Sequence, residues 1–173
     1  MKRARLLCLL PFVLGACATP PAVLSRGTFA EVTVQGAQAT DLSGQRVRWG
    51  GSIVVTTPEK DQTCFEVVSR PLDRRARPRL TDQSDGRFLA CAPGFFDPAV
   101  YAAGREITVV GSLQTSTMRQ IGEYEYRYPR VAAEEVFLWP KREPIPPYYF
   151  YGPPYGPWPD PFWYPMWRPW PYW

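Results

Sequence analysis

The run from Gln45 to Val55 constrains the fold more than any other feature of this chain. Apolar and polar side chains alternate along it, and two adjacent glycines, Gly50 and Gly51, stand in its middle. The alternation predicts a β-strand with one buried and one wet face, because successive side chains of a strand point to opposite sides of the sheet. Glycines inside a strand favour a bulge or a sharp bend, which a small barrel needs in order to close. The buried side is expected to carry Val47, Trp49, Ile53 and Val55, and the wet side Arg46, Arg48 and Ser52.

Further runs of this kind predict the rest of an all-β domain. Strands are expected at Thr63 to Ser69, Gly86 to Cys91, Glu106 to Leu113 and Gly122 to Trp139, the last being one bent strand or two. Between the third and the fourth strand, Asp97 followed by Pro98 predicts a short helix that ends by Gly104, with Asp97 as its N-cap. This order is typical of a small OB-like antiparallel β-barrel with one short helix. A flat three-layer sandwich is the alternative, but a core of roughly 110 residues without a second set of strands would not fill two sheets.

The N-terminus carries the pattern of a secretory signal. Lys2, Arg3 and Arg5 precede an apolar run over residues 6–14, and Leu14-Gly15-Ala16-Cys17 resembles the bacterial site at which a cysteine is acylated before cleavage. A transmembrane anchor is the weaker interpretation, because the run has only about half of the 20 or so apolar residues that span a bilayer. We therefore predict a signal peptide over residues 1–16, lipidation of Cys17 and a lipidated tether over residues 17–27.

Composition excludes several classes of function. The chain has no histidine, which removes His-based catalytic triads and His-bearing zinc sites. Its 20 Lys and Arg residues stand against 16 Asp and Glu, and three of the basic residues leave with the signal peptide. One basic cluster remains, from Arg70 to Arg79, which is too little for the basic stripe of a nucleic-acid-binding protein. No nucleic acid, metal or other cofactor is expected.

Two cysteines remain once Cys8 is removed with the signal and Cys17 is acylated. In an exported, oxidising compartment, Cys64 and Cys91 are expected to form a disulfide. Two separate buried thiols or a metal site are the alternatives, although two sulfurs fall short of a four-ligand zinc cage.

Residues 141–173 form a tail rich in proline and aromatic residues. Its prolines exclude a regular helix or a central strand and favour an extended, disordered chain. Tryptophan favours membrane and protein interfaces, because it combines a large apolar body with a polar N–H. A low-complexity extension that folds back over the domain carries equal weight. The side chains expected to contact a partner or the membrane are Trp158, Trp163, Trp167, Trp170 and Trp173.

Arginines provide the candidate ligand-binding groups. Arg70, Arg74, Arg75 and Arg87 fall on or beside the second and third strands, which carry the ligand groove of OB-type barrels. Guanidinium groups suit bidentate recognition of phosphate or carboxylate, as in a lipid headgroup or an anionic glycan. A solvated basic loop is the alternative, and the more frequent one.

Catalytic residues are not expected. The polar candidates each have a simpler role as a turn residue, a helix cap or a surface charge. These candidates are Asp82, Asp85, Arg87, Asp97, Arg105 and Glu123. The sequence therefore predicts a protein that is not an enzyme.

Several short motifs follow one another from about Thr28 to Pro140. They include Val47-Arg48-Trp49-Gly50-Gly51-Ser52-Ile53, Arg70-Pro71-Leu72, Asp85-Gly86-Arg87-Phe88, Gly94-Phe95-Phe96-Asp97-Pro98, Tyr101-Ala102-Ala103-Gly104-Arg105, Gly122-Glu123-Tyr124-Glu125-Tyr126 and Leu138-Trp139-Pro140. In kind and order they resemble the Slp family of outer-membrane lipoproteins, so residues 28–140 are expected to form an Slp-like β-barrel domain.

The resemblance implies a lipid-anchored protein on the periplasmic face of the outer membrane that supports the envelope under starvation or stress. By resemblance to other bacterial lipoproteins, Ala18 after the acylated cysteine favours sorting to the outer membrane. The expected partners are that membrane and another envelope protein or a glycan. The alternative function is a periplasmic OB-like module that binds an anionic glycan or a lipid headgroup.

Overall fold

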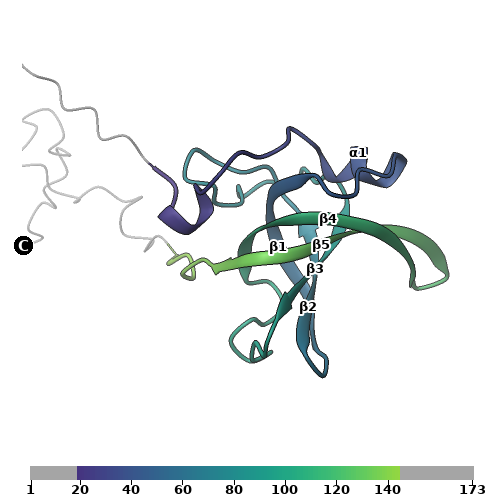
Figure 1. Ribbon diagram of the computed structural model, residues 1–173. Coiled ribbons are helices and arrows are strands. Elements are labelled where there is room, and N and C mark those ends of the chain that lie inside the picture. Colours follow the sequence, from purple (N-terminus) through teal and green to yellow (C-terminus); the bar gives the residue numbers. More distant parts are fainter. Residues whose placement is uncertain (1–18, 145–173) are drawn as a thin grey trace, which may run out of the picture. The chain divides into compact units, whose positions relative to one another are not determined.

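Five strands close into a barrel in the computed structural model, which describes residues 19–144 (Figure 1). The barrel order is β1-β2-β3-β5-β4, and every neighbouring pair is antiparallel except β3 with β5. The elements are η1 (Ala22–Leu24), α1 (Val34–Ala39), β1 (Arg46–Pro58), β2 (Gln62–Ser69), β3 (Arg87–Pro93), β4 (Glu106–Ile121) and β5 (Tyr124–Leu138). The prediction of a small OB-like all-β barrel is confirmed.

The apolar side of β1 faces the barrel interior over its first half. Val47, Trp49 and Ile53 are buried there, and the Trp49 ring meets that of Phe88 edge to face at 5.4 Å. Val55, predicted on the same side, is 48% exposed. That prediction is wrong because the β1–β2 register shifts between Ile53 and Val55, and such a bulge moves the following side chains to the other face.

Glycines within the strands, the predicted Gly51 among them, lie where two backbones approach closely. A Cβ on Gly51 would overlap the carbonyl oxygen of Val68 in β2, and one on Gly111 would overlap that of Ala132 in β5. Gly111 also sits at a register shift between β4 and β5. The absence of a side chain therefore lets the strands coil tightly enough for the ring to close.

The short helix predicted between Asp97 and Gly104 is wrong. Asp97 does cap a turn, because its carboxylate accepts the N–H of Ala99 at 2.8 Å and its carbonyl oxygen accepts that of Tyr101. The chain then runs along β1, where Thr56 donates to the Tyr101 carbonyl and Gly104 donates to that of Ile53. These contacts with β1 replace the helical hydrogen bonds that would continue the turn.

The α-helix of the described region comes before the first strand instead. Thr33 caps α1 by accepting the N–H of Gly36 at 3.0 Å. Val34 and Ala37 point from α1 into the main core cluster. The Trp49 indole donates to the carbonyl oxygen of Val32 at 2.7 Å, which fixes the approach to the helix. A helix this short gives little sequence periodicity, and tertiary contacts determine its position.

Cys64 of β2 and Cys91 of β3 stand opposite each other in the strand register and are joined by a disulfide, with their Cα atoms 4.0 Å apart. Both cysteines are buried on the outside of the barrel, in a small cluster with Leu89 and Tyr128. The covalent ring that they close contains the whole β2–β3 connection. The bridge therefore limits how far that connection can open in the unfolded chain.

Removing the bridge is expected to destabilise the barrel without changing its fold. A separation of 27 residues corresponds to about 3.5 kcal/mol on the loop-entropy model. The variant Cys64→Ala/Cys91→Ala should lose about that free energy of unfolding, measured by denaturant titration. Reducing agent should lower the stability of the wild type and leave the variant unchanged. Equal stability of oxidised wild type and variant would contradict the prediction.

Candidate functional site

The two ends of the described chain pack side by side on the outside of the barrel. Leu24 and Trp139 share one buried cluster with Val110 of β4 and Ala76 of the β2–β3 loop. In Figure 1 the first and last coloured segments lie on the same side of the barrel. We call this surface the terminal face and define it by residues 22–29, the loop 70–80 and residues 137–141. Residues 22–24 and 139–141, near the two ends of the described barrel unit, therefore both belong to the terminal face.

Two arginines of β1 hold the N-terminal part of this face. Arg48 donates to the carbonyl oxygen of Leu24 at 3.0 Å, and Arg46 donates to that of Arg26 at 2.6 Å. Both guanidinium groups stack over the ring of Phe29, at 4.7 and 5.1 Å from its centroid. Arg46 also forms an ion pair with Glu134 of β5. The polar side of β1 was expected to face solvent, but its arginines bind residues 22–29 instead.

A hydrogen-bond relay holds the C-terminal part. The Trp139 indole donates to the Thr108 hydroxyl at 2.9 Å, and that hydroxyl donates to the carbonyl oxygen of Ala76 at 2.7 Å. Thr108 is fully buried on β4, and its single hydroxyl serves both partners. Ala76 takes a left-handed backbone conformation with φ at 62°, which a non-glycine residue adopts only where its surroundings enforce it. The relay thus ties the loop 70–80 to the strand from which the tail departs.

Two more arginines brace the same exit. Arg77 forms an ion pair with Glu106 at 2.7 Å and donates to the carbonyl oxygen of Pro140, also at 2.7 Å. Its guanidinium lies 5.4 Å from the centroid of the Trp139 ring. Arg105 donates to the Trp139 carbonyl at 3.0 Å. None of these roles follows from local sequence, because each joins residues that only the closed barrel brings together.

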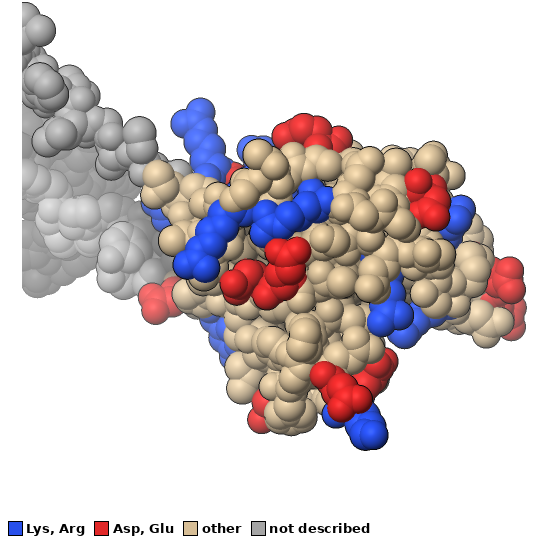
Figure 2. All heavy atoms as spheres, viewed as in Figure 1, with Lys and Arg blue, Asp and Glu red and all other residues tan. Residues whose placement is uncertain are grey.

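The structure divides the four predicted ligand-binding arginines between two places. Arg70, Arg74 and Arg75 belong to the terminal face, whereas Arg87 lies on β3. Arg70 donates to the Gln83 carbonyl at 3.2 Å and lines a shallow hollow of about 340 Å³ with Arg79. Arg74 and Arg75 are exposed, and within residues 19–144 neither side chain has a bonding partner. Figure 2 shows Lys and Arg side chains, with acidic ones beside them, at this end of the molecule.

Arg87 is engaged by an acidic partner instead. Its guanidinium lies 2.6 Å from Glu66, and the Tyr128 hydroxyl donates to the same carboxylate oxygen at 2.8 Å. The hydrogen bond that the Arg87 guanidinium donates to Glu66 raises the pKa of Arg87 above its ordinary value. Burial, aided by the bond to Glu66, raises the pKa of Tyr128 to about 12. Arg87 thus holds a structural position on the barrel wall, and its attraction for a free anion is reduced by Glu66.

The outer surface of β2 and β3 is covered by the protein itself. The disulfide and Leu89 pack there under Tyr128, with Ile121 and Tyr126 of the β4–β5 hairpin beside them. Tyr126 accepts the backbone N–H of Arg87 at 2.9 Å, which fixes the hairpin to β3. OB-type barrels bind their ligands at this surface and its flanking loops. In this chain the hairpin occupies the surface.

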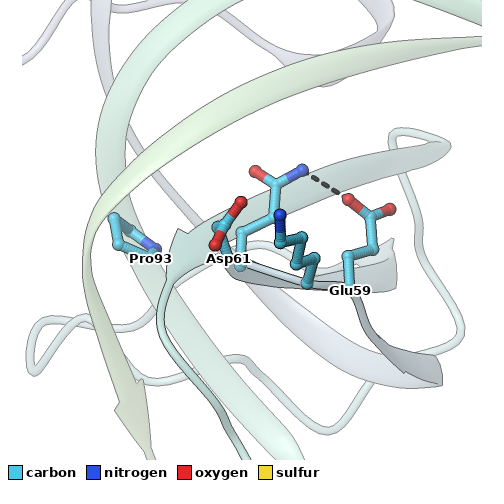
Figure 3. A pocket seen from close by; sticks show the side chains of 5 residues that line it. Glu59, Asp61 and Pro93 are labelled. Carbon is cyan, nitrogen blue, oxygen red and sulfur yellow. Dashed lines mark hydrogen bonds between the residues drawn. The ribbon is translucent and has the colours of Figure 1, made fainter.

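A hollow of about 410 Å³ lies at the β1–β2 turn and Pro93 (Figure 3). The Gln62 amide donates to the carboxylate of Glu59, and Lys60 lines the same wall as Asp61. Across residues 19–144 no group of three or more acidic, histidine or cysteine side chains is placed to hold a metal ion. The hollow is open and lined by turn residues.

The polar residues weighed as catalytic candidates are dispersed over the barrel. Asp97 caps its turn and Arg105 supports the Trp139 carbonyl. Asp82 and Asp85 line different hollows, and Glu123 lies in the exposed turn between β4 and β5. The structure therefore does not bring these side chains together.

Two groups of predicted site residues lie outside the described residues. They are Cys17 at the N-terminus and the tail residues Trp158, Trp163, Trp167, Trp170 and Trp173. No helix within residues 19–144 has the length and hydropathy needed to cross a bilayer.

The raised pKa of Tyr128 makes stability depend on alkaline pH. Its protonated form is favoured in the folded state, so its contribution is complete below the unfolded pKa of about 10 and is lost as the pH rises towards 12. The free energy of unfolding should fall by up to about 2 kcal/mol over that range from this group. Tyr128→Phe should remove this part of the pH dependence, as measured by denaturant titration. Tyr124→Phe is the matched control, because Tyr124 is 69% exposed, and it should keep the wild-type pH profile.

A family model and three sequence relatives match this chain. Residues 14–173 match the family model described as the outer membrane lipoprotein Slp family. An uncharacterised protein of Haemophilus influenzae is 36% identical over 131 residues, covering 74% of this chain and 71% of the relative. Outer membrane protein Slp of Escherichia coli is 28% identical over 171 residues, covering 94% and 89%. The uncharacterised lipoprotein YeaY of Escherichia coli is 33% identical over 123 residues, covering 65% and 63%.

Solved structures with a related arrangement of strands are distant. The small single-stranded DNA-binding protein of Streptomyces coelicolor aligns with a TM-score of 0.38 at 16% identity, over 55% of this chain and 94% of its own. The mitochondrial single-stranded DNA-binding protein Rim1 of S. cerevisiae aligns with a TM-score of 0.36 at 11% identity, over 58% and 99%. The family assignment rests on sequence: because the family model covers nearly the whole chain, this protein belongs to the Slp family of outer membrane lipoproteins.

Proposed function

We propose that the chain is a non-enzymatic lipoprotein, held on the periplasmic face of the outer membrane by acyl chains on Cys17, that supports the envelope under starvation or stress. Membership of the Slp family supports the location. The observation that carries the proposal is the shortness of the connection between anchor and barrel. Ala22 begins η1 five positions after Cys17, so the connection spans at most about 18 Å. The barrel is thus held close to the bilayer.

The absence of enzymatic activity is supported by how the polar groups are used. Thr108, Glu106 and Arg77 are buried or half-buried, and their polar atoms bond to other parts of the fold. Within the described region, the Glu66 carboxylate and the Tyr128 hydroxyl likewise satisfy each other. A catalytic centre needs polar groups that converge on a substrate, and these groups converge on one another.

The tail supplies the contact with a second envelope component in this proposal. The chain leaves the barrel at Pro140, on the terminal face that also carries the connection to the anchor. Residues 141–173 therefore start near the membrane-proximal side of the barrel. Their tryptophans are proposed to engage another envelope protein, with the rings acting as interface anchors.

One observation favours the alternative function, the binding of an anionic glycan or a lipid headgroup. Arg74 and Arg75 are exposed and, within the described residues, without a side-chain partner. Arg70 stands beside them in the loop. Arg87 is the weakest member of the predicted set, because Glu66 already neutralises it.

Lipidation is tested by Cys17→Ser in cells. Three acyl chains, each worth about 0.8 kcal/mol per buried methylene, exceed what stable anchoring requires. The variant should lose acylation, measured by mass spectrometry, and should leave the outer-membrane fraction. Cys8→Ser is the matched control, because that cysteine lies within the predicted signal peptide and should change neither result. A Cys17→Ser protein that is still cut before residue 17 and stays in the membrane would refute the anchor.

The tail is tested by deleting residues 144–173. The deletion should leave the melting temperature nearly unchanged, since the core clusters of the barrel are formed by residues before it. It should abolish a crosslink to an envelope protein that the full chain forms in intact cells. Replacing the five tail tryptophans by alanine, with the prolines kept, should abolish the same crosslink. A sharp fall in melting temperature with crosslinks unaltered would make the tail part of the fold.

A further inference from the structure

The terminal face carries positive charge that its internal contacts do not use. Arg46, Arg48, Arg77 and Arg105 all donate to groups of the fold itself. Arg74 and Arg75 are exposed at the tip of the loop 70–80, and across residues 19–144 their side chains make no bond. The stretch from Arg70 to Arg79 holds five arginines and one aspartate. Because Asp73 accepts the N–H groups of Arg75 and Arg77, its charge is turned into the loop.

A large apolar side chain stands at the end of the same loop. Leu80 is 77% exposed and lines the hollow that Arg70 and Arg79 share. Asp82 and Glu106 line the same hollow. At a bilayer surface the aliphatic group enters the acyl boundary while the guanidinium groups meet headgroup phosphates.

From these positions we infer that the terminal face lies against the bilayer that holds the anchor, with Arg74, Arg75 and Leu80 contacting acidic phospholipid headgroups of that leaflet. Acidic phospholipid is thus the ligand assigned to the loop 70–80. The orientation of the barrel on the membrane rests on the lipid anchor of the proposed function. It also assigns the opposite pole of the barrel, the β4–β5 hairpin, to the side away from the membrane (Figure 1).

The loop is fixed rigidly to the segment that leads to the anchor. Ala76 of the loop packs in one cluster with Leu24, and its carbonyl oxygen accepts the Thr108 hydroxyl. A bridge between Leu72 and Pro78 closes the base of the loop. The backbone of the loop is therefore held beside η1, and η1 lies within about 18 Å of extended chain from Cys17.

The positive charge of the loop 70–80 and its ordered backbone both favour contact with the bilayer. The attraction of an anionic surface for a cation falls off within about 8 Å at physiological salt, so only a face held close to the bilayer gains from it. The loop is already ordered by Asp73 and Ala76, which reduces the entropy that binding would remove. No change of fold is needed for the guanidinium groups to reach phosphate.

The test uses the mature full chain with Cys17→Ser, made without its signal peptide, so that no acyl chain contributes. Its partition onto vesicles of phosphatidylcholine, with and without phosphatidylglycerol, is measured by co-sedimentation. Arg74→Gln/Arg75→Gln should bind the acidic vesicles about thirtyfold more weakly, since each arginine near the surface is worth about fivefold. Arg119→Gln/Arg127→Gln, on the β4–β5 hairpin, makes the same change in charge and should lose less than about twofold. All of the variants compared retain the tail, residues 141–173.

Several outcomes would overturn the inference. The first is unchanged vesicle binding of the Arg74→Gln/Arg75→Gln variant, and the second is an equal loss of binding in the hairpin variant. The third is a stronger inhibition of binding by inorganic phosphate than by another salt at the same ionic strength, which would indicate a discrete phosphate site. Tighter binding of a soluble acidic polysaccharide than of the vesicles would assign the loop to a glycan instead. Failure of lipidation leaves this experiment unaffected, because the chain tested has no anchor.

Orientation is measured separately with the acylated protein on the same vesicles. An environment-sensitive fluorophore on Leu80→Cys should shift to the blue on binding. The same label on Met118→Cys should not, because Met118 is also exposed, at 57%, but lies on β4 near its hairpin. A shift for Met118→Cys that equals or exceeds that of Leu80→Cys would overturn the orientation even if the vesicle result holds.

Discussion

The arrangement of the terminal face depends on the two hydrogen bonds of the buried Thr108 hydroxyl. This hydroxyl accepts from the Trp139 indole and donates to the Ala76 carbonyl, so one side chain of β4 joins the exit of β5 to the β2–β3 loop. Loss of either partner would leave a polar atom unsatisfied in an apolar cluster, a cost of about 1 to 3 kcal/mol. Arg77 and Arg105 then reinforce a geometry that the hydroxyl has already determined.

The barrel has closed the surface at which OB-type domains bind ligands. The outer surface of β2 and β3 is covered by Tyr128, the disulfide and Leu89. Glu66 forms an ion pair with Arg87 there. Arg74 and Arg75, whose side chains have no bonding partner within residues 19–144, lie in the β2–β3 loop and not on this surface.

The strands could be predicted from sequence, because alternation and turn residues are local signals. Each predicted strand is present, and Cys64 and Cys91 stand opposite each other as their places at the two ends of adjacent strands imply. Val55 could not be placed, because a bulge of one residue changes the face and depends on the neighbouring strand. The turn at Asp97 shows the same limit: its cap is local, but its contacts with β1 are not. The side of β1 that carries Arg46 and Arg48 was expected to face solvent, because the partners of these arginines are distant in sequence. Arg26 lies 20 positions from Arg46, and Leu24 lies 24 positions from Arg48.

The adjacency of the two chain ends has a mechanical consequence. Tension applied between Ala22 and Pro140 would first load the contacts that hold residues 22–29 to the barrel, including the contact between Leu24 and Trp139. The bonds from Arg48 to Leu24 and from Arg46 to Arg26 carry that load first. Their rupture would free residues 22–29 and lengthen the tether by about 28 Å at full extension, while the barrel stays folded. Residues 22–29 are then the part of the described chain that would lengthen before the strands separate.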